Sequence, residues 1–336
     1  MTDLKLDIYG VGILISGYEK TLFKLGKDFS YFKRDFEGRG DYRIHIEHTK
    51  KVDYSLIPED AEPIFTHPEF FMYQSGEKKC IDYCGRGISV YDPRDKQIRL
   101  YSPDKDLQHE IAYLAVISSA GELLEKRGYF RAHGMGVKYG EKTAIMLGSS
   151  GMGKTRLFLG LLKDPDVSIY SDDILLLDKK RNLFPFPLRI GVKAKSELPE
   201  GIDKSLVYEM NRRKYGKKIL LDTSAFSDRI APPSQPSTIL IASRWNSEGF
   251  KYRPASRIKV FRMLIRDMGI GYGLPQLMEY MNLSFKLSGF PGILIRGFRR
   301  LILIFSLSLS GKAYYIYLGR DSDKNTQGLI DLLEKT

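Results

Sequence analysis

The sequence has 336 residues, which is enough for about two domains with a buried core. Its composition, 43% hydrophobic and 28% charged, excludes a disordered chain, and its two cysteines exclude a disulfide scaffold and favour a reducing, cytoplasmic setting. The net charge of +12 is scattered along the chain without a recognised nucleic-acid motif, so we expect no nucleic-acid partner.

The sequence also predicts that a signal peptide, a membrane span and a zinc site are absent. The first residues lack the positive segment of a signal peptide, and the most apolar run, Leu301–Leu309, is far shorter than a membrane span. That run favours a core strand or a buried helix. The basic and apolar segment Phe285–Arg300 leaves contact with a membrane surface open as an alternative. Cys80 and Cys84 have no second ligand pair, so we expect no zinc site.

Residues 1–105 predict an antiparallel, β-rich domain. Leu4–Ser16 ends in an apolar run broken by glycines, and Tyr42–His48 alternates as a half-buried strand does. Four more short runs are rich in aromatic and β-branched residues and are separated by turn sequences, which predicts a meander. These runs are Phe70–Gln74, Lys79–Tyr83, Ile88–Tyr91 and Gln97–Ser102.

Residues 106–128 then show the three-to-four spacing of a connecting helix, and residues 129–336 form the second predicted domain. Tyr129–Val137 predicts a strand in a hairpin with a second strand at Thr143–Leu147. His133 is therefore expected on the strand that pairs with Thr143–Leu147. Further strands are predicted at Val167–Tyr170, Ile174–Leu177, Lys218–Asp222, Thr238–Ser243 and Lys312–Leu318, and helices at residues 258–282 and Gln327–Glu334.

The most informative motif is G-x-x-x-x-G-K-T, which follows an apolar strand and precedes an apolar helical run. This context predicts a phosphate-binding loop that takes a nucleoside triphosphate. The glycines allow close backbone approach, the lysine reaches the β- and γ-phosphates, and the threonine hydroxyl binds Mg²⁺. The predicted nucleotide contacts are Gly148, Ser149, Ser150, Gly151, Met152, Gly153, Lys154 and Thr155.

Three more polar residues are expected near this loop. Asp172 and Asp173 follow Lys154 by 18 and 19 residues, a gap that a short helix and a strand fill, so the pair returns to the carboxyl edge of the sheet. Neighbouring strand residues point to opposite faces, so one carboxylate is expected to hold Mg²⁺ and the other to accept a proton. His133 is either structural or placed to orient an aspartate or contact a phosphate.

The order His133-Gly134, then Gly148 to Thr155, then Ser171-Asp172-Asp173 resembles the catalytic domain of HPr kinase/phosphorylase. It is more similar still to HPr-kinase-like proteins of peptide-modification gene clusters. The resemblance is tight over residues 129–178. It implies an α/β (α+β) fold with a P-loop domain of the HPr kinase and phosphoenolpyruvate carboxykinase type, preceded by the β-rich domain.

The resemblance also implies roles. Asp172 matches the catalytic acid/base, Lys154 and His133 match catalytic residues, and Thr155 and Asp173 match Mg²⁺ contacts. A Glu-Ile-Arg-Gly-type signature of true HPr kinases is absent after the Asp pair, so neither phosphorylase activity nor HPr as substrate is expected.

The resemblance therefore implies a cytoplasmic, ATP- and Mg²⁺-dependent kinase that phosphorylates a hydroxyl, most simply a serine of a protein or peptide. HPr kinases are hexamers, so a homo-oligomer stays open. Two other functions also stay open: a regulatory module that binds nucleotide without transferring phosphate, and a kinase acting on a small molecule such as free serine.

Overall fold

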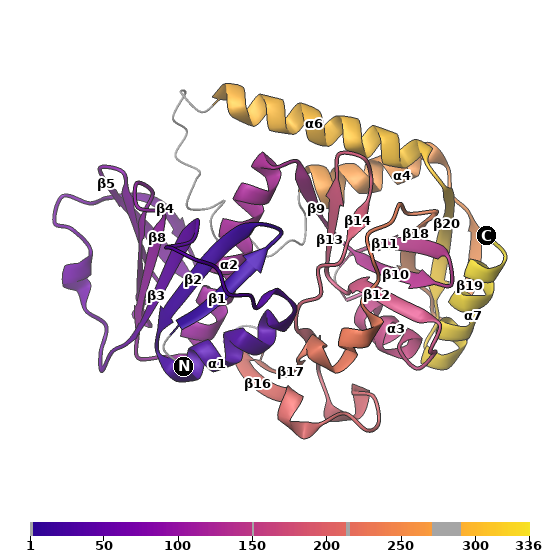
Figure 1. Cartoon of the computed structure of the whole chain (residues 1–336), viewed down its shortest axis with the longest axis horizontal. Coiled ribbons are helices and arrows are strands. Elements are labelled where there is room, and N and C mark those ends of the chain that lie inside the picture. Colours follow the sequence, from indigo (N-terminus) through magenta and orange to yellow (C-terminus); the bar gives the residue numbers. More distant parts are fainter. Residues whose placement is uncertain (1–2, 150, 213–215, 271–289) are drawn as a thin grey trace. The chain divides into compact units, whose positions relative to one another are not determined.

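The computed structural model describes residues 3–149, 151–212, 216–270 and 290–336 (Figure 1). It is a mixed α/β protein with several sheets. The described chain divides into two compact units. The first holds residues 3–123, 208–212 and 216–218, and the second holds the remaining described residues.

The first unit is built on an eight-stranded sheet in the order β1-β2-β3-β8-β7-β6-β5-β4. The predicted meander is confirmed, because strands β4 to β8 are all antiparallel neighbours. The expectation of a wholly antiparallel domain is wrong, because β2 pairs with β3, and β3 with β8, in parallel. The strands are β1 Asp3–Ile8, β2 Val11–Gly17, β3 Tyr42–His48, β4 Glu62–His67, β5 Phe70–Ser75, β6 Lys78–Asp82, β7 Ile88–Asp92 and β8 Gln97–Ser102.

A helix that the sequence pattern did not reveal explains the parallel pairing. Helix α1 (Glu19–Asp28) lies in the connection between β2 and β3 and packs on β1 and β2. Parallel neighbours need a crossover of this kind, because a tight turn can only reverse the chain. The predicted connecting helix is confirmed as α2 (Lys105–Lys126). It belongs to the first unit up to Leu123 and to the second from Leu124.

The second unit is centred on a six-stranded sheet in the order β12-β10-β11-β18-β20-β19. The predicted hairpin is confirmed as β10 and β11, and β11, β18 and β20 run parallel. The strands are β10 Met135–Tyr139, β11 Lys142–Leu147, β12 Val167–Ser171, β18 Thr238–Arg244, β19 Lys251–Pro254 and β20 Lys312–Leu318.

Two three-stranded sheets accompany it. One has the order β14-β13-β9, with β9 Tyr129–His133, β13 Ile174–Asp178 and β14 Leu183–Phe184. The other has the order β15-β17-β16, with β15 Ile190–Val192, β16 Val207–Arg212 and β17 Gly216–Leu221.

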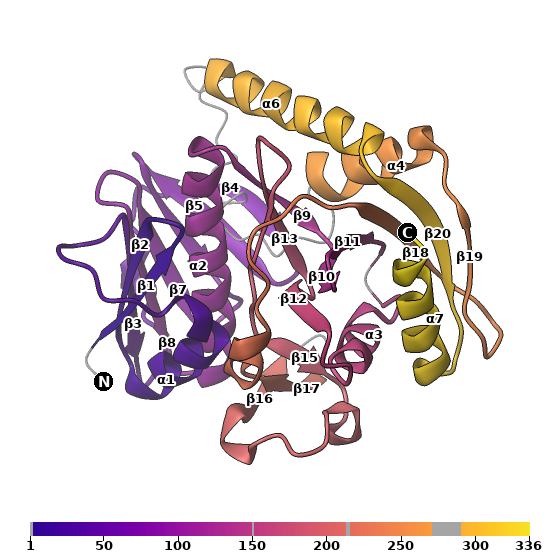
Figure 2. The same cartoon turned by 45° about the vertical axis from the view of Figure 1, so that its right-hand side comes forward.

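Helices cover both faces of the six-stranded sheet (Figure 2). Alternate residues of β11 point to opposite faces, so Ala144 and Met146 enter one core while Ile145 and Leu147 enter the other. The first core is shared with α3 and α7, and the second with α4, α6 and the short π-helix η6. The helices are α3 Lys154–Leu161, α4 Arg257–Leu264, η6 Ile265–Gly269, α6 Phe290–Leu309 and α7 Ser322–Glu334.

The prediction of one continuous strand over Tyr129–Val137 is wrong, because the chain bends at Gly134. Before the bend, His133 pairs with Ile174 of β13; after it, Gly136 pairs with Ser171 of β12. His133 therefore does not lie on the strand that pairs with β11, as expected from the hairpin. The Gly134 N–H donates to the Asp173 carbonyl at 3.0 Å, which holds the bend against the opposite chain.

The apolar run Leu301–Leu309 forms the second half of α6, but it is not fully buried. Leu303, Ile304 and Leu307 are buried, whereas Leu301 and Phe305 are about half exposed. Among the described helices, none is long and apolar enough to cross a membrane. The predicted helix over residues 258–282 is present as α4 and η6, and its part from residue 271 lies outside the described residues, as do residues 285–289.

The bend leaves no room for a side chain at Gly134. A Cβ there would lie 2.6 Å from the Met146 carbonyl oxygen and 2.8 Å from Leu175 Cδ1. We expect Gly134→Ala to destabilise the protein by about 1–3 kcal/mol, as overpacking does. Gly297 of α6 has open space around its Cβ position, so Gly297→Ala is expected to stabilise by about 0.5–1 kcal/mol. Urea unfolding of both variants measures the contrast, and equal stabilities would contradict it.

Candidate functional site

The glycine-rich loop lies between β11 and α3, in the strand–loop–helix context that the motif predicts. Gly151 and Gly153 have φ angles of 82° and 94°, in the left-handed region where a Cβ causes strain. Gly153 is also the residue before the first turn of α3. Met152 is half-buried, and Ser150 lies outside the described residues. The glycines therefore allow the chain to turn tightly into the helix.

Lys154 is the buried cation of this loop, with 6% of its surface exposed. Its Nζ donates to the carbonyl oxygens of Gly148 at 2.7 Å and Ser149 at 3.2 Å. Burial lowers the pKa of Lys154, and the nearby carboxylates of Asp173, Asp267 and Asp172 oppose that shift. The ammonium is thus held within hydrogen-bond reach of the loop and inside a field of negative charge.

His133 connects this lysine to one of the two aspartates. Lys154 Nζ lies 3.0 Å from His133 Nε2, and His133 Nδ1 lies 3.3 Å from Asp173 Oδ1. An ammonium has only protons to give, so Nε2 must be the bare nitrogen and Nδ1 must carry the ring proton toward the carboxylate. The Nδ1–Asp173 contact is close, but it is not aligned as a hydrogen bond.

The two aspartates have different surroundings, but they lie in the turn between β12 and β13 and not, as was expected, on a strand. Asp172 is 7% exposed, and its Oδ2 lies 3.4 Å from the Thr155 hydroxyl oxygen. The Asp173 side chain is 45% exposed. Ser171 Oγ accepts from the backbone N–H groups of Asp173 and Ile174 and so fixes the turn between β12 and β13. One carboxylate therefore faces the loop threonine, and the other faces His133 and solvent.

The structure adds two residues that the sequence reasoning missed. Arg266 of η6 donates from Nη1 to Ser149 Oγ at 3.1 Å and pairs through two nitrogens with Asp267. Asp267 is fully buried. The signal was present as an Arg-Asp dipeptide within the apolar run from Val260 to Met268. A π-helix often marks a functional position, because it re-aims side chains that an α-helix would place elsewhere.

Thr155 and Asp172 have the chemistry and spacing of a Mg²⁺ pair. Two oxygens bound to one Mg²⁺ at about 2.1 Å and at a right angle are about 3.0 Å apart, close to the 3.4 Å between these two. Within the described ranges, no group of three or more His, Cys, Asp or Glu side chains is placed to hold a metal. Mg²⁺ does not require one, since it keeps several waters and binds phosphate oxygens as well.

No protein-family model matches the sequence, and no curated protein matches it. The site is therefore interpreted from its own residues.

The buried ammonium leads to a stability prediction. With its pKa lowered by burial, the charged form of Lys154 is penalised in the folded protein. The penalty is complete below the lowered folded-state pKa. It fades as pH rises toward the ordinary value of 10.5, because the folded protein releases the proton first. We expect Lys154→Met to raise the melting temperature near neutral pH, with a smaller gain at about pH 10.

Thermal unfolding at both pH values measures this difference. Lys50→Met removes an exposed lysine from the first unit and serves as the control, with little change expected at either pH. A lower melting temperature for Lys154→Met at both pH values would show that the contacts of the ammonium outweigh its desolvation.

Proposed function

We propose that this protein is a cytoplasmic kinase that uses ATP and Mg²⁺ to phosphorylate a hydroxyl, in the first instance a serine of a protein or peptide. The observation that carries the proposal is the convergence at one loop of a buried lysine, a histidine–aspartate contact and a threonine–aspartate contact. Phosphoryl transfer needs these parts: a cation at the phosphates, ligands for Mg²⁺ and a positioned carboxylate. We propose with it a nucleotide-binding domain of the HPr kinase type.

Binding of the triphosphate is assigned to the loop and to Lys154. The loop from Gly148 to Thr155 would wrap the phosphates at the N-terminus of α3, where backbone N–H groups favour an anion. Lys154 Nζ would exchange its contacts with the Gly148 and Ser149 carbonyls for phosphate oxygens. Thr155 and Asp172 would hold Mg²⁺, which supplies neutralisation of the charge on the β- and γ-phosphate oxygens when bound.

Proton transfer is assigned to Asp173. Its half-exposed carboxylate would accept the proton as the acceptor O–H bond breaks, a new O–P bond forms, and the bond to ADP breaks. His133 points Nδ1–H toward Asp173 and Nε2 toward Lys154. It would therefore position the carboxylate relative to the ammonium that binds the phosphates. These roles are the reverse of those that the family resemblance implies for the two aspartates.

Arg266 would support the loop from η6. Its contact with Ser149 Oγ fixes one end of the loop, and the buried Asp267 neutralises and orients its guanidinium. A bidentate pair of this kind holds a side chain in one geometry. We assign Arg266 as a positioning residue.

The reversed roles predict different defects for two amide substitutions. We expect Asp173→Asn to leave binding of Mg²⁺ and ATP intact and to slow transfer by about 10²–10⁴-fold, the usual effect of a lost general base. We expect Asp172→Asn to weaken ATP binding in Mg²⁺ far more than in EDTA. Calorimetry with and without Mg²⁺, together with single-turnover transfer, separates the two. The opposite outcome is normal Mg²⁺-dependent binding without transfer in Asp172→Asn, and normal transfer in Asp173→Asn. It would support the roles that the family resemblance implies, with Asp172 as the base and Asp173 at Mg²⁺.

The activity itself is tested by label transfer. The full-length protein is incubated with γ-labelled ATP and either a cell extract, a serine-containing peptide or free serine. We expect a labelled protein or peptide band. Lys154→Ala should abolish this band, because it removes the ammonium that binds the phosphates. Phosphate release without a labelled acceptor would favour the regulatory module, and labelled free serine alone would favour a small-molecule kinase.

A further inference from the structure

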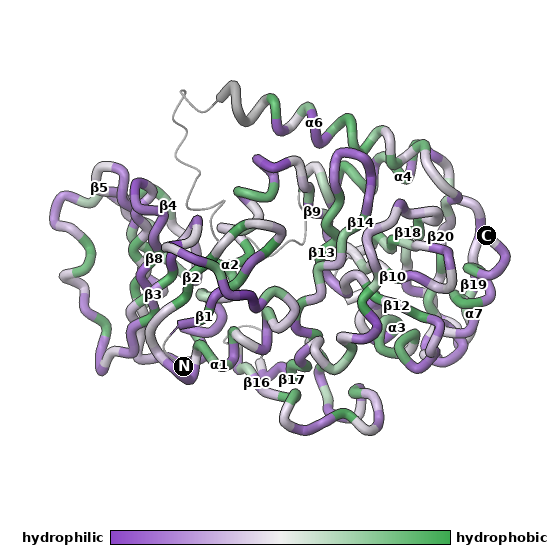
Figure 3. Tube along the Cα trace, viewed as in Figure 1, coloured by the Kyte–Doolittle hydropathy of each residue, from purple (hydrophilic) through white to green (hydrophobic). Residues whose placement is uncertain are grey.

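Helix α6 presents a second apolar face, and the described residues of the second unit leave this face exposed. Its buried face is formed by Leu303, Ile304 and Leu307, which pack with α4 and η6. Figure 3 shows apolar and polar residues following one another along the helix. The exposed apolar residues are Ile295 (53%), Phe298 (66%), Leu301 (47%), Ile302 (53%), Phe305 (58%) and Leu309 (56%).

These residues form one stripe. Ile295, Phe298, Ile302, Phe305 and Leu309 follow each other at intervals of three and four, so they share one side of an α-helix over about four turns. Isolated exposed apolar residues are normal on a protein surface, but a contiguous stripe with two phenylalanines marks an interaction surface.

The charge around the stripe has one sign. Within α6 the charged residues are Arg296, Arg299 and Arg300, and the helix has no acidic residue. Arg300 is anchored inward, through Glu125 and the Gly269 carbonyl oxygen. Arg299 lines a cavity together with Ile302 of the stripe. An apolar face bordered by arginines is the pattern of a helix that lies in a lipid–water interface.

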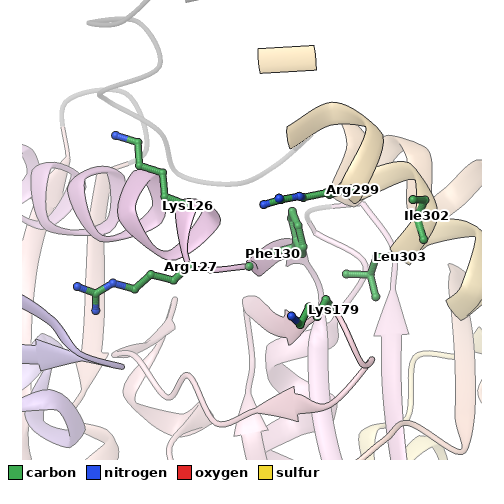
Figure 4. Close-up of a pocket in the computed structure, with 8 residues that line it drawn as sticks. Lys126, Arg127, Phe130, Lys179, Arg299, Ile302 and Leu303 are labelled. Carbon is green, nitrogen blue, oxygen red and sulfur yellow. The ribbon is translucent and has the colours of Figure 1, made fainter. Parts of the chain in front are cut away.

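A cationic cavity borders the stripe, and this observation is independent of the apolar pattern. It has a volume of about 340 Å³, and Arg299 and Ile302 line it from α6. Figure 4 shows Arg299 extending from α6 over Phe130, with Lys179 on the other side of that ring. Lys126, the last residue of α2, and Arg127 after it also border the cavity, with their side chains extending away from Phe130. The cations of Arg299 and Lys179 therefore lie at a space that opens beside exposed apolar residues.

We propose that α6 and this cavity together bind the surface of an anionic membrane. The stripe would enter the boundary between headgroups and acyl chains, and the cavity would receive lipid phosphate groups. Both features match a lipid. The stripe offers apolar contact along α6, and the cavity, which Arg299 and Ile302 line, offers positive charge beside it. A second copy of the chain fits less well, because two α6 helices would bring arginines together with no acidic residue on either helix.

The test is flotation of the full-length protein with vesicles. One set is phosphatidylcholine alone, and in the other about a third of the lipid is anionic phosphatidylglycerol. We expect flotation with the anionic vesicles only, reduced by salt. Phe298→Glu with Phe305→Glu should reduce the bound fraction at least about tenfold, and Lys179→Glu with Arg299→Glu should do the same. All four side chains lie at the surface, so the fold is expected to survive.

Two matched variants control for charge and for lost apolar surface. Phe23→Glu with Ile64→Glu replaces two exposed apolar residues of the first unit, and Lys50→Glu with Lys51→Glu reverses two exposed lysines there. Both should float as the wild type does. Flotation lost equally in these controls, or no flotation with anionic vesicles, would overturn the proposal. It would also be overturned if light scattering showed an oligomer that Phe298→Glu with Phe305→Glu dissociates, or if an acidic protein, but no vesicle, bound the stripe.

Discussion

The bend at Gly134 is the constraint on which the candidate site depends. A pair of antiparallel chain segments passes from the small β9–β13 sheet to the β10–β12 edge of the larger one, and both change direction at the same level. His133 comes directly before the change on one segment, and Asp172-Asp173 form the change on the other. Since a side chain at Gly134 would collide with the Met146 carbonyl oxygen, the two segments approach β11 and its loop only because this residue is a glycine.

Beside that bend, Lys154 Nζ lies within hydrogen-bond distance of His133 Nε2, so the ammonium selects the ring nitrogen that accepts. Lys154 is costly to bury as a cation, and its neighbours are arranged to accept from it: two loop carbonyls and the bare nitrogen of His133. The carboxylates near it counter the loss of water, as buried ions require. A fixed ammonium among fixed acceptors is preorganised, so little rearrangement is left for the moment when phosphate charge must be stabilised.

Local patterns predicted most strands and the loop, because alternation and turn residues are properties of neighbours in sequence. They failed where the structure depends on contacts between segments that are distant in sequence. Nothing local to Tyr129–Val137 shows that the chain bends at Gly134 beside the Met146 carbonyl oxygen, and nothing local to Tyr42–His48 shows a parallel partner. Arg266 was missed for the same reason, since its relation to Ser149 spans 117 residues. The aspartate pair was found because its distance from the loop is short enough to read as one strand–helix–strand unit.

That long separation has a consequence during synthesis. Strand β11, the loop and α3 leave the ribosome early, but β18, which lies next to β11, begins at Thr238, and the partner of Ser149 comes later still. β20, the parallel neighbour of β18, begins only at Lys312. Contacts between such distant residues form slowly, because chain closure must precede them. The loop therefore emerges before the strands and the arginine that complete its surroundings. In a nascent chain its site stays incomplete until β18, Arg266 and β20 have been synthesised.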